Sequence, residues 1–262
     1  MNRPSSLNFP IFRSALAAAA ALLLTSAAIS AQSTDDLLKQ GGVFDQRLEA
    51  GEALKCYLAA EKQEPRNPAV LARIARQYRH LMVDAPAKAE KLRLGRIALG
   101  YAHNAVTLAP DLAEAQLSVA ITHGKLVPLL GKKEQVETSA LIKSAVDRTL
   151  ALDPRSDTAW HILGRWHRNL AEIGGMKRAL AGAIYGSLPK GSNEEAAKSL
   201  EKAVALNPDR LMHHIELGRI YAQMGRKDDA RKFIGKGLAM PNGEKDDPET
   251  KARGREELKK LR

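Results

Sequence analysis

Apolar residues recur along this chain at helical spacings, small ones alternating with large ones, and a proline follows each apolar stretch. Pro65, Pro110, Pro154, Pro208 and Pro241 are separated by 45, 44, 54 and 33 positions. Proline cannot continue a helix, because its ring clashes with the preceding turn and its nitrogen has no proton to donate. The pattern therefore predicts five helix ends, each at the same point of a helical unit that repeats along the chain.

A tetratricopeptide repeat is a pair of antiparallel helices, A and B, in about 34 residues, with small residues where the helices cross. If each proline takes position 32 of such a repeat, position 8 of the following helix A should be small. Ala75, Ala120, Gly164 and Gly218 occupy that position. We therefore predict an all-α fold, a tetratricopeptide-like α-α superhelix (a right-handed solenoid) of about four helical pairs with insertions.

The earlier units are longer than a standard repeat. The longest extra stretch, around residues 172–193, contains the amphipathic run MKRALAGAIYG and predicts an additional short helix. The polar stretch Asp247–Lys260 predicts a last helix that can end a solenoid in water. Residues 32–43, which include Gly41–Gly42, are expected to form a short helix and a flexible joint. The repeat domain is then expected over residues 44–262.

The first residues differ in composition from the rest of the chain. Arg3 and Arg13 precede an apolar run over residues 15–24, which passes into small residues up to Ala31. So short an apolar run is typical of a secretory signal peptide, which we predict over residues 1–31 with cleavage after Ala31. An uncleaved membrane anchor is the alternative. The mature protein is expected to be exported, and either periplasmic or secreted.

The charge indicates what kind of partner the protein binds. Its formal net charge is +11, with 41 basic and 30 acidic residues. In an exported protein, such a charge favours anionic partners such as acidic peptides, phospholipid head groups or cell-wall polymers over nucleic acid. Cys56 is the only cysteine, so the chain forms no internal disulfide.

A family resemblance rests on the stretch from His161 to Pro208. Its His-x-Leu-Gly-Arg-Trp start, the insertion with Lys177 and Arg178, and a Glu-Glu-Ala helix opening follow in that order. This stretch resembles the regulator of microtubule dynamics protein family, and the similarity extends over about residues 49–241. The resemblance implies a tetratricopeptide-like domain. It also implies phospholipid binding or transfer, which some membrane-anchored animal members perform. Microtubule association is not expected of an exported bacterial protein.

The concave groove of a tetratricopeptide domain is lined by positions 5, 9 and 12 of the A helices, which share one helical stripe. Five of the twelve residues at these positions are arginine and none is acidic. Those twelve are Ala72, Arg76, Arg79, Leu117, Ile121, Gly124, His161, Arg165, Arg168, Ile215, Arg219 and Ala222.

Arginine's planar fork binds carboxylate and phosphate oxygens in a bidentate manner, so this stripe predicts an anion-binding groove. The alternative is that the arginines are solvated or pair with glutamates. The predicted groove residues are Arg76, Arg79, His161, Arg165, Arg168 and Arg219. Lys177, Arg178 and Tyr185 of the insertion are expected near the groove.

Catalytic and metal-binding patterns are missing from the sequence. It contains no Gly-rich phosphate loop, no HExxH and no GxSxG motif. His213 and His214 are adjacent and therefore diverge on a helix, while His161 and His167 are six positions apart. Neither spacing suits a metal. We expect a non-enzymatic protein with no cofactor and no metal.

Two functions follow from the sequence. The first is a scaffold whose basic groove holds an acidic or C-terminal peptide segment of another protein. The second, implied by the family resemblance, is a phospholipid-binding or lipid-transfer module. In that case residues 180–185 would cover an acyl chain and the arginines would hold the phosphate. No nucleic-acid partner is expected, and no oligomeric state is predicted.

Overall fold

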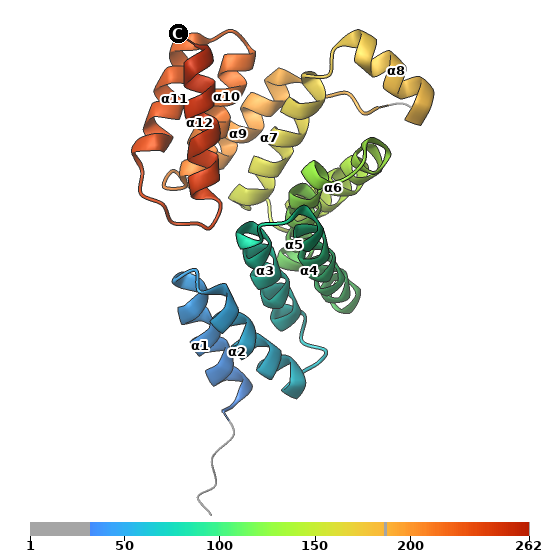
Figure 1. The fold of residues 1–262 in the computed structure, drawn as a ribbon, viewed down its shortest axis with the longest axis vertical. Coiled ribbons are helices and arrows are strands. Elements are labelled where there is room, and N and C mark those ends of the chain that lie inside the picture. Colours follow the sequence, from blue (N-terminus) through green and yellow to red (C-terminus); the bar gives the residue numbers. More distant parts are fainter. Residues whose placement is uncertain (1–31, 186–187, 262) are drawn as a thin grey trace, which may run out of the picture. The chain divides into compact units, whose positions relative to one another are not determined.

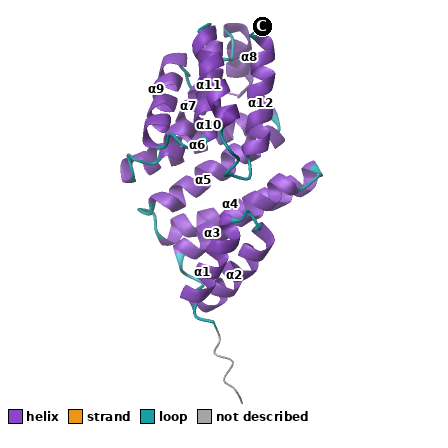
Figure 2. Ribbon diagram, turned by 90° about the vertical axis from the view of Figure 1, so that its left-hand side faces the viewer, coloured by secondary structure: helices purple, strands orange, loops and turns teal. Residues whose placement is uncertain are grey.

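The structure, a computed structural model, describes residues 32–185 and 188–261. These residues form helices and loops, with no strand among them (Figures 1 and 2). The predicted signal peptide, residues 1–31, lies outside the described residues. The helices are α1 (Thr34–Gln46), α2 (Ala50–Gln63), α3 (Pro68–Asp84), α4 (Lys88–Leu108), α5 (Ala113–Leu126), the 3-10 helix η1 (Val127–Leu129), α6 (Lys132–Leu152), α7 (Asp157–Ala171), α8 (Gly175–Tyr185), α9 (Asn193–Leu206), α10 (Leu211–Gln223), α11 (Lys227–Ala239) and α12 (Asp247–Lys260).

The helices pack in consecutive pairs. α1 packs on α2, α3 on α4, α5 on α6, α7 on α9, and α10 on α11, while α12 covers α10 and α11. The second helix of each pair ends two residues before one of the five prolines. The prediction of an all-α, tetratricopeptide-like superhelix is confirmed.

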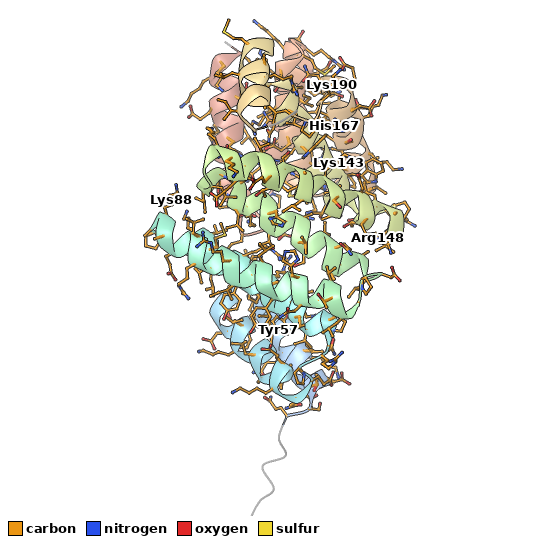
Figure 3. The ribbon with its side chains drawn as sticks, turned by 90° about the vertical axis from the view of Figure 1, so that its right-hand side faces the viewer. Tyr57, Lys88, Lys143, Arg148, His167 and Lys190 are labelled. Carbon is orange, nitrogen blue, oxygen red and sulfur yellow. The ribbon has the colours of Figure 1, made fainter. Side chains whose placement is uncertain are left out.

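The flexible joint expected at Gly41–Gly42 is wrong, because α1 runs through both glycines. A Cβ atom on Gly41 would lie 2.5 Å from Cε1 of Tyr57, so the glycine lets α1 approach α2 closely. Tyr57 is fully buried where α1, α2 and α3 meet (Figure 3). Helix α1 is therefore the first helix of a pair, and the described residues contain five pairs rather than four.

Two of the small residues at position 8, Gly164 and Gly218, lie at close helix crossings. A Cβ atom on Gly164 would lie 2.6 Å from Cγ of Leu200, and one on Gly218 would lie 2.6 Å from Cγ1 of Ile234. Each glycine thus lets helix A of its pair touch helix B. This is the physical reason for the repeating pattern of small residues.

The extra length of the earlier units lies in long helices and one added helix. Helices α4 and α6 have 21 residues each, and η1 follows α5. The additional short helix predicted between α7 and α9 is α8, and the predicted polar last helix is α12. Among residues 32–185 and 188–261, no helix is both long and apolar enough to span a bilayer.

Candidate functional site

A cavity of about 810 Å³ lies on the side of the domain formed by the A helices. Helices α3, α5, α7 and α10 contribute to its wall, together with α6, α12 and the segment before α12. Eight lysines and arginines and four carboxylates line it, so the wall is net basic. These are Arg76, Arg79, Lys91, Lys125, Lys132, Arg165, Arg210 and Arg253, and Glu216, Glu244, Asp246 and Glu249.

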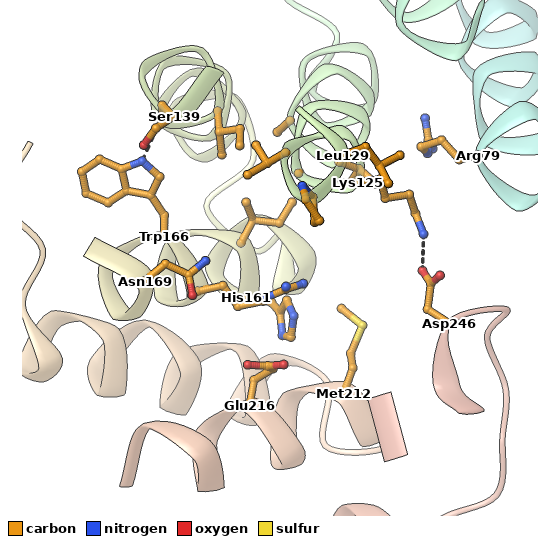
Figure 4. A pocket seen from close by; sticks show the side chains of 18 of the residues that line it. Arg79, Lys125, Leu129, Ser139, His161, Trp166, Asn169, Met212, Glu216 and Asp246 are labelled. Atoms are coloured by element: carbon orange, nitrogen blue, oxygen red, sulfur yellow. Dashed lines mark hydrogen bonds and ion pairs between the residues drawn. The ribbon is translucent and has the colours of Figure 1, made fainter. Parts of the chain in front are cut away.

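Helix α7 gives the cavity both polar and apolar side chains. His161, Arg165 and Asn169 line it from positions four residues apart, which places them on one face of the helix. Trp166, the residue after Arg165 on α7, also lines the cavity. Its indole Nε1 donates a hydrogen bond to the Ser139 carbonyl at 3.0 Å (Figure 4). One helix therefore offers a cation, a polar ring and apolar surface to the same cavity.

The two sides of the cavity differ in chemistry. Figure 4 places Trp166 and Asn169 at one side, and Arg79, Lys125 and Asp246 at the other. An apolar recess accompanies Trp166, and apolar side chains of several elements form it. We define the recess by Ile142, Ile162, Trp166, Leu170 and Ile173, which line the cavity and belong to one apolar cluster.

A buried carboxylate, Glu216 of α10, lies at the floor of the cavity. Arg219 donates to it at 2.8 Å, and the Nε atoms of Arg168 and Arg253 lie 3.7 Å from its oxygens. Burial alone would raise the pKa of Glu216, but the charges of Arg165, Arg219 and Arg168 outweigh it and hold that pKa far below its usual value. Sequence reasoning missed Glu216, because it lies off the predicted stripe.

The two groove arginines of α3 have partners of different kinds. Arg76 donates through Nε to Asp45 at 3.0 Å and through Nη2 to Glu244 at 3.3 Å. Arg79 is buried, and its hydrogen bonds to described residues go to the neutral hydroxyls of Ser118 and Thr122. Burial and the charge of Arg76 lower the pKa of Arg79 to about 9.

The segment before α12, residues 241–246, contacts α3 and α5 of the second and third helix pairs; we call it the strap. Glu244 reaches Arg76, Lys245 lies 2.8 Å from a carboxylate oxygen of Asp84, and Asp246 lies 2.5 Å from Nζ of Lys125 (Figure 4). The strap thus joins the C-terminal end of the domain to α3 and α5. No pattern in the sequence signals these contacts, which span more than 100 positions.

The predicted groove residues separate into two groups. Arg76, Arg79, His161 and Arg165 line the cavity, whereas Arg168 and Arg219 lie beside Glu216 and do not line it. The interpretation that the arginines pair with acidic residues therefore applies to three of them: Arg76, Arg168 and Arg219. Arg165 lines the cavity and makes no hydrogen bond or ion pair with any residue that the structure describes, although its charge is the largest of those that lower the pKa of Glu216.

Of the three insertion residues predicted near the cavity, only Arg178 has a described side chain, and it does not line the cavity. Arg178 donates to the carbonyls of Leu170, Leu188 and Pro189 and so fastens α8 to the end of α7. The side chains of Lys177 and Tyr185 lie outside the described residues. The described insertion residues that line the cavity are Ile173, Ala181 and Leu188.

The prediction that residues 180–185 cover an acyl chain is wrong for Leu180 and Ile184, the two large side chains described in this stretch. Leu180 and Ile184 are 63% and 59% exposed, and neither lines the cavity. Among the described side chains of α8, that of Ala181 contributes to the wall.

Two histidines from separate A helices meet at the edge of the cavity. His161 of α7 and His213 of α10 lie with their Nδ1 atoms 3.1 Å apart, and Nε2 of His213 is 2.8 Å from Oδ2 of Asp157. Both imidazoles are buried. Sequence spacing cannot reveal this pair, because 52 positions separate them. Across the described part of the chain, no three His, Cys, Asp or Glu residues are placed to hold a metal ion.

Comparison with known proteins places the chain in a family. The model of the family "Regulator of microtubule dynamics protein 1-3" matches residues 32–262. Regulator of microtubule dynamics protein 1 of Mus musculus is 26% identical over 200 residues, which cover 75% of this chain and 66% of the mouse protein. The Bos taurus protein of the same name is 26% identical over 221 residues, which cover 83% and 69%. The chain thus spans about two thirds of the length of these relatives.

A solved structure supports the same assignment of fold. A thermophilic TPR protein of Thermus thermophilus superposes with a TM-score of 0.60 at 20% identity, covering 86% of this chain and 99% of that one. The fold is therefore that of tetratricopeptide repeat proteins. The family match covers all the repeat pairs and the last helix. This chain belongs to the regulator of microtubule dynamics protein family.

Proposed function

We propose that the protein is a non-enzymatic scaffold whose cavity holds an acidic or C-terminal peptide segment of a partner protein. The strap is the observation that carries this proposal. It is an irregular peptide segment, and its carboxylates pair with two cations of the cavity, Arg76 and Lys125. The cavity wall therefore already binds acidic peptide groups supplied by its own chain.

Charge balance supports binding of a further anion. Lysines and arginines outnumber carboxylates in the wall by eight to four. Arg165 lacks an ion-pair partner among the described residues, and its buried Nε atom lacks a hydrogen-bond acceptor. A carboxylate placed against Arg165 would gain a bidentate, charge-assisted hydrogen bond in a partly desolvated site.

Binding rather than catalysis agrees with the chemistry of the wall. The one thiol of the chain, Cys56, is buried in α2, and burial raises its pKa, which disfavours a reactive thiolate. His161 and His213 contact each other, and His213 also contacts Asp157. No described hydroxyl or thiol is hydrogen-bonded to either ring as a nucleophile would be.

The experiment is a fluorescence anisotropy titration of the purified domain, residues 32–262, with a labelled acidic peptide. The probe is a hexapeptide of five glutamates and a C-terminal leucine with a free carboxylate, and its control has glutamine in place of every glutamate. The proposal predicts saturable binding of the acidic probe that weakens as salt is raised, and much weaker binding of the control. Equal binding of both peptides, or none, contradicts it.

A second candidate function is phospholipid binding, which the apolar recess favours. The recess around Ile162, Trp166 and Leu170 would take an acyl chain while Arg165 holds the phosphate. Native mass spectrometry after incubation with vesicles of phosphatidylcholine and phosphatidic acid tests this. A phosphatidic acid adduct that displaces the acidic peptide supports lipid as the ligand, and the absence of an adduct excludes it.

Export is part of the proposal, because the sequence of residues 1–31 has the features of a signal peptide. The partner is then a protein outside the cytoplasm. N-terminal sequencing of the protein isolated from its host tests this point. A mature chain that begins at Gln32 supports cleavage, and a chain that retains its first residues contradicts it.

A further inference from the structure

The contact between His161 and His213 determines which ring nitrogens carry protons. Nε2 of His213 lies 2.8 Å from Oδ2 of Asp157. The hydrogen bond from His213 and the charge of Arg210 oppose the effect of burial and keep the pKa of Asp157 below its usual value, so this carboxylate is ionised. An ionised carboxylate only accepts hydrogen bonds, and Nε2 of His213 therefore carries a proton.

The proton on Nε2 of His213 fixes the state of His161. Burial lowers the pKa of both His213 and His161, so both rings are neutral at neutral pH. A neutral ring carries one proton, which leaves Nδ1 of His213 as an acceptor. Nδ1 of His161, 3.1 Å away, must then be the donor. His161 is held as the tautomer whose Nε2 atom is an unprotonated acceptor.

This acceptor faces the cavity. His161 is 4% exposed and lines the cavity wall. The one hydrogen bond of its ring to described residues is the contact with His213 at Nδ1. Nδ1 of His214 and Nδ1 of His167 are buried and have no hydrogen-bond partner among the described residues. Nε2 of His161 is not enclosed in this way. A nine-tenths buried ring thus presents an unused acceptor to a ligand.

The neighbours of His161 on α7 suggest which donor would meet it. Arg165 and Asn169 follow at intervals of four residues, which is a rise of about 6 Å per step. An extended peptide repeats every two residues, or about 6.6 Å. A peptide that lies along α7 can therefore meet an acceptor, a cation and an amide at successive repeats.

We propose that His161 is a specificity residue that accepts a backbone N–H of the peptide whose carboxylate is bound by Arg165, and that His213 and Asp157 are positioning residues that hold its tautomer. This inference rests on the proposed peptide-binding function and names the group that the ligand must offer. The carboxylate is either that of the peptide's C-terminus or that of an acidic side chain.

A double-mutant cycle between ligand and protein tests the contact. Two peptides are compared: the acidic hexapeptide and its analogue that is N-methylated at the last peptide bond. Each is titrated against two proteins, the unaltered domain and the His161→Phe variant. We expect N-methylation to weaken binding about tenfold in the unaltered domain, as for the loss of one hydrogen bond to a buried acceptor, and less than twofold in His161→Phe.

The outcomes separate this inference from the function on which it rests. If the unmethylated peptide binds but N-methylation is equally costly in both domains, the role of His161 is wrong while peptide binding stands. If no peptide binds, both are wrong. A third probe, amidated at its C-terminus, identifies the carboxylate: a large loss of affinity assigns the terminal carboxylate to Arg165, and an unchanged affinity assigns a side chain.

Nitrogen-15 NMR of the histidine rings tests the positioning residues without any ligand. The unaltered domain should show His161 with a protonated Nδ1 and an unprotonated Nε2. Asp157→Asn and His213→Phe should each weaken that preference, a change that a merely structural role would not produce. A protonated Nε2 on His161 in the unaltered domain overturns the inference even if both variants fail to fold.

Discussion

Asp246, in the strap before α12, lies with a carboxylate oxygen 2.5 Å from Nζ of Lys125 on α5, which is 121 positions earlier in the chain. Burial lowers the pKa of Lys125, and the charge of Asp246 opposes this effect. Together with the pair of Glu244 and Arg76, this contact places acidic groups of the chain against the basic cavity wall. A ligand's carboxylates must compete with the strap for the same cations.

The strap is therefore expected to limit affinity. Replacing Glu244 by Gln and Asp246 by Asn removes two negative charges from the cavity wall and frees Lys125, while Arg76 keeps its bond to Asp45. We therefore expect the acidic hexapeptide to bind several times more tightly. The pairs are partly exposed, and their loss should cost only about 1 kcal/mol each. Anisotropy titration measures the affinity, and Asp228→Asn on α11, whose side chain is fully exposed, is the control. Weaker peptide binding in the double variant would show that the strap does not compete.

Glu216 should be essential for stability. Its side chain is 1% exposed and is surrounded by three arginines within 4 Å. Glu216→Gln leaves those cations without a buried counter-charge, so we expect the free energy of unfolding to fall by about 3–5 kcal/mol. Urea denaturation measures it, with the exposed Glu256→Gln as the control. Equal stability of the two variants contradicts this account of the floor of the cavity.

Acid should destabilise the fold through its buried histidines. Burial lowers the pKa of both His80 and His123 to about 4, whereas each titrates near 6.5 in the unfolded chain. Between these values the unfolded chain binds more protons than the folded chain, so stability falls as the pH drops through the window from 6.5 to 4. Each histidine can contribute at most about 1.4 kcal/mol per pH unit.

The variant His123→Phe isolates one of these contributions. The decrease in unfolding free energy between pH 7 and pH 5 should be smaller in this variant than in the unaltered domain. Urea denaturation at both pH values measures the difference. A decrease of unchanged size in His123→Phe contradicts the assignment.

The close crossing of α10 and α11 gives a prediction about packing. Gly218→Ala would bring Cβ within 2.6 Å of the side chain of Ile234 and within 2.9 Å of the carbonyl oxygen of Ala230. We expect a loss of about 1–3 kcal/mol, because α10 and α11 must move apart. Gly235→Ala, on α11 with open space around it, should instead stabilise the helix by about 0.5–1 kcal/mol. Thermal unfolding distinguishes the two, and a loss of similar size in both contradicts the packing explanation.

The fold could be predicted because its signals are local. Helices end before Pro65 and Pro208 for steric reasons, and Gly164 and Gly218 fall where backbones touch. The prediction of a flexible joint at Gly41 was wrong, because the sequence does not distinguish a glycine that permits close helix packing from one that permits a bend. The distinction depends on Tyr57, which α2 brings to it.

The site was harder to predict, because its charges come from distant parts of the chain. The helical stripe identifies Arg165 as a groove residue. It does not reveal that Glu216 and the strap neutralise other arginines of the same stripe. The acceptor on His161 likewise depends on His213, which the packing of α7 near α10 supplies. Which of the described cations stay unpaired becomes visible once the helices are packed.

Charge reversal at Arg165 is the most direct test of the central claim that the cavity binds an anionic peptide. Isothermal titration calorimetry should compare Arg165→Glu with Arg155→Glu, which makes the same change at an exposed loop position, and helicity should be checked by circular dichroism. The proposal predicts that Arg165→Glu abolishes binding of the acidic hexapeptide while Arg155→Glu leaves it within about twofold. Unchanged affinity in a folded Arg165→Glu variant would contradict it.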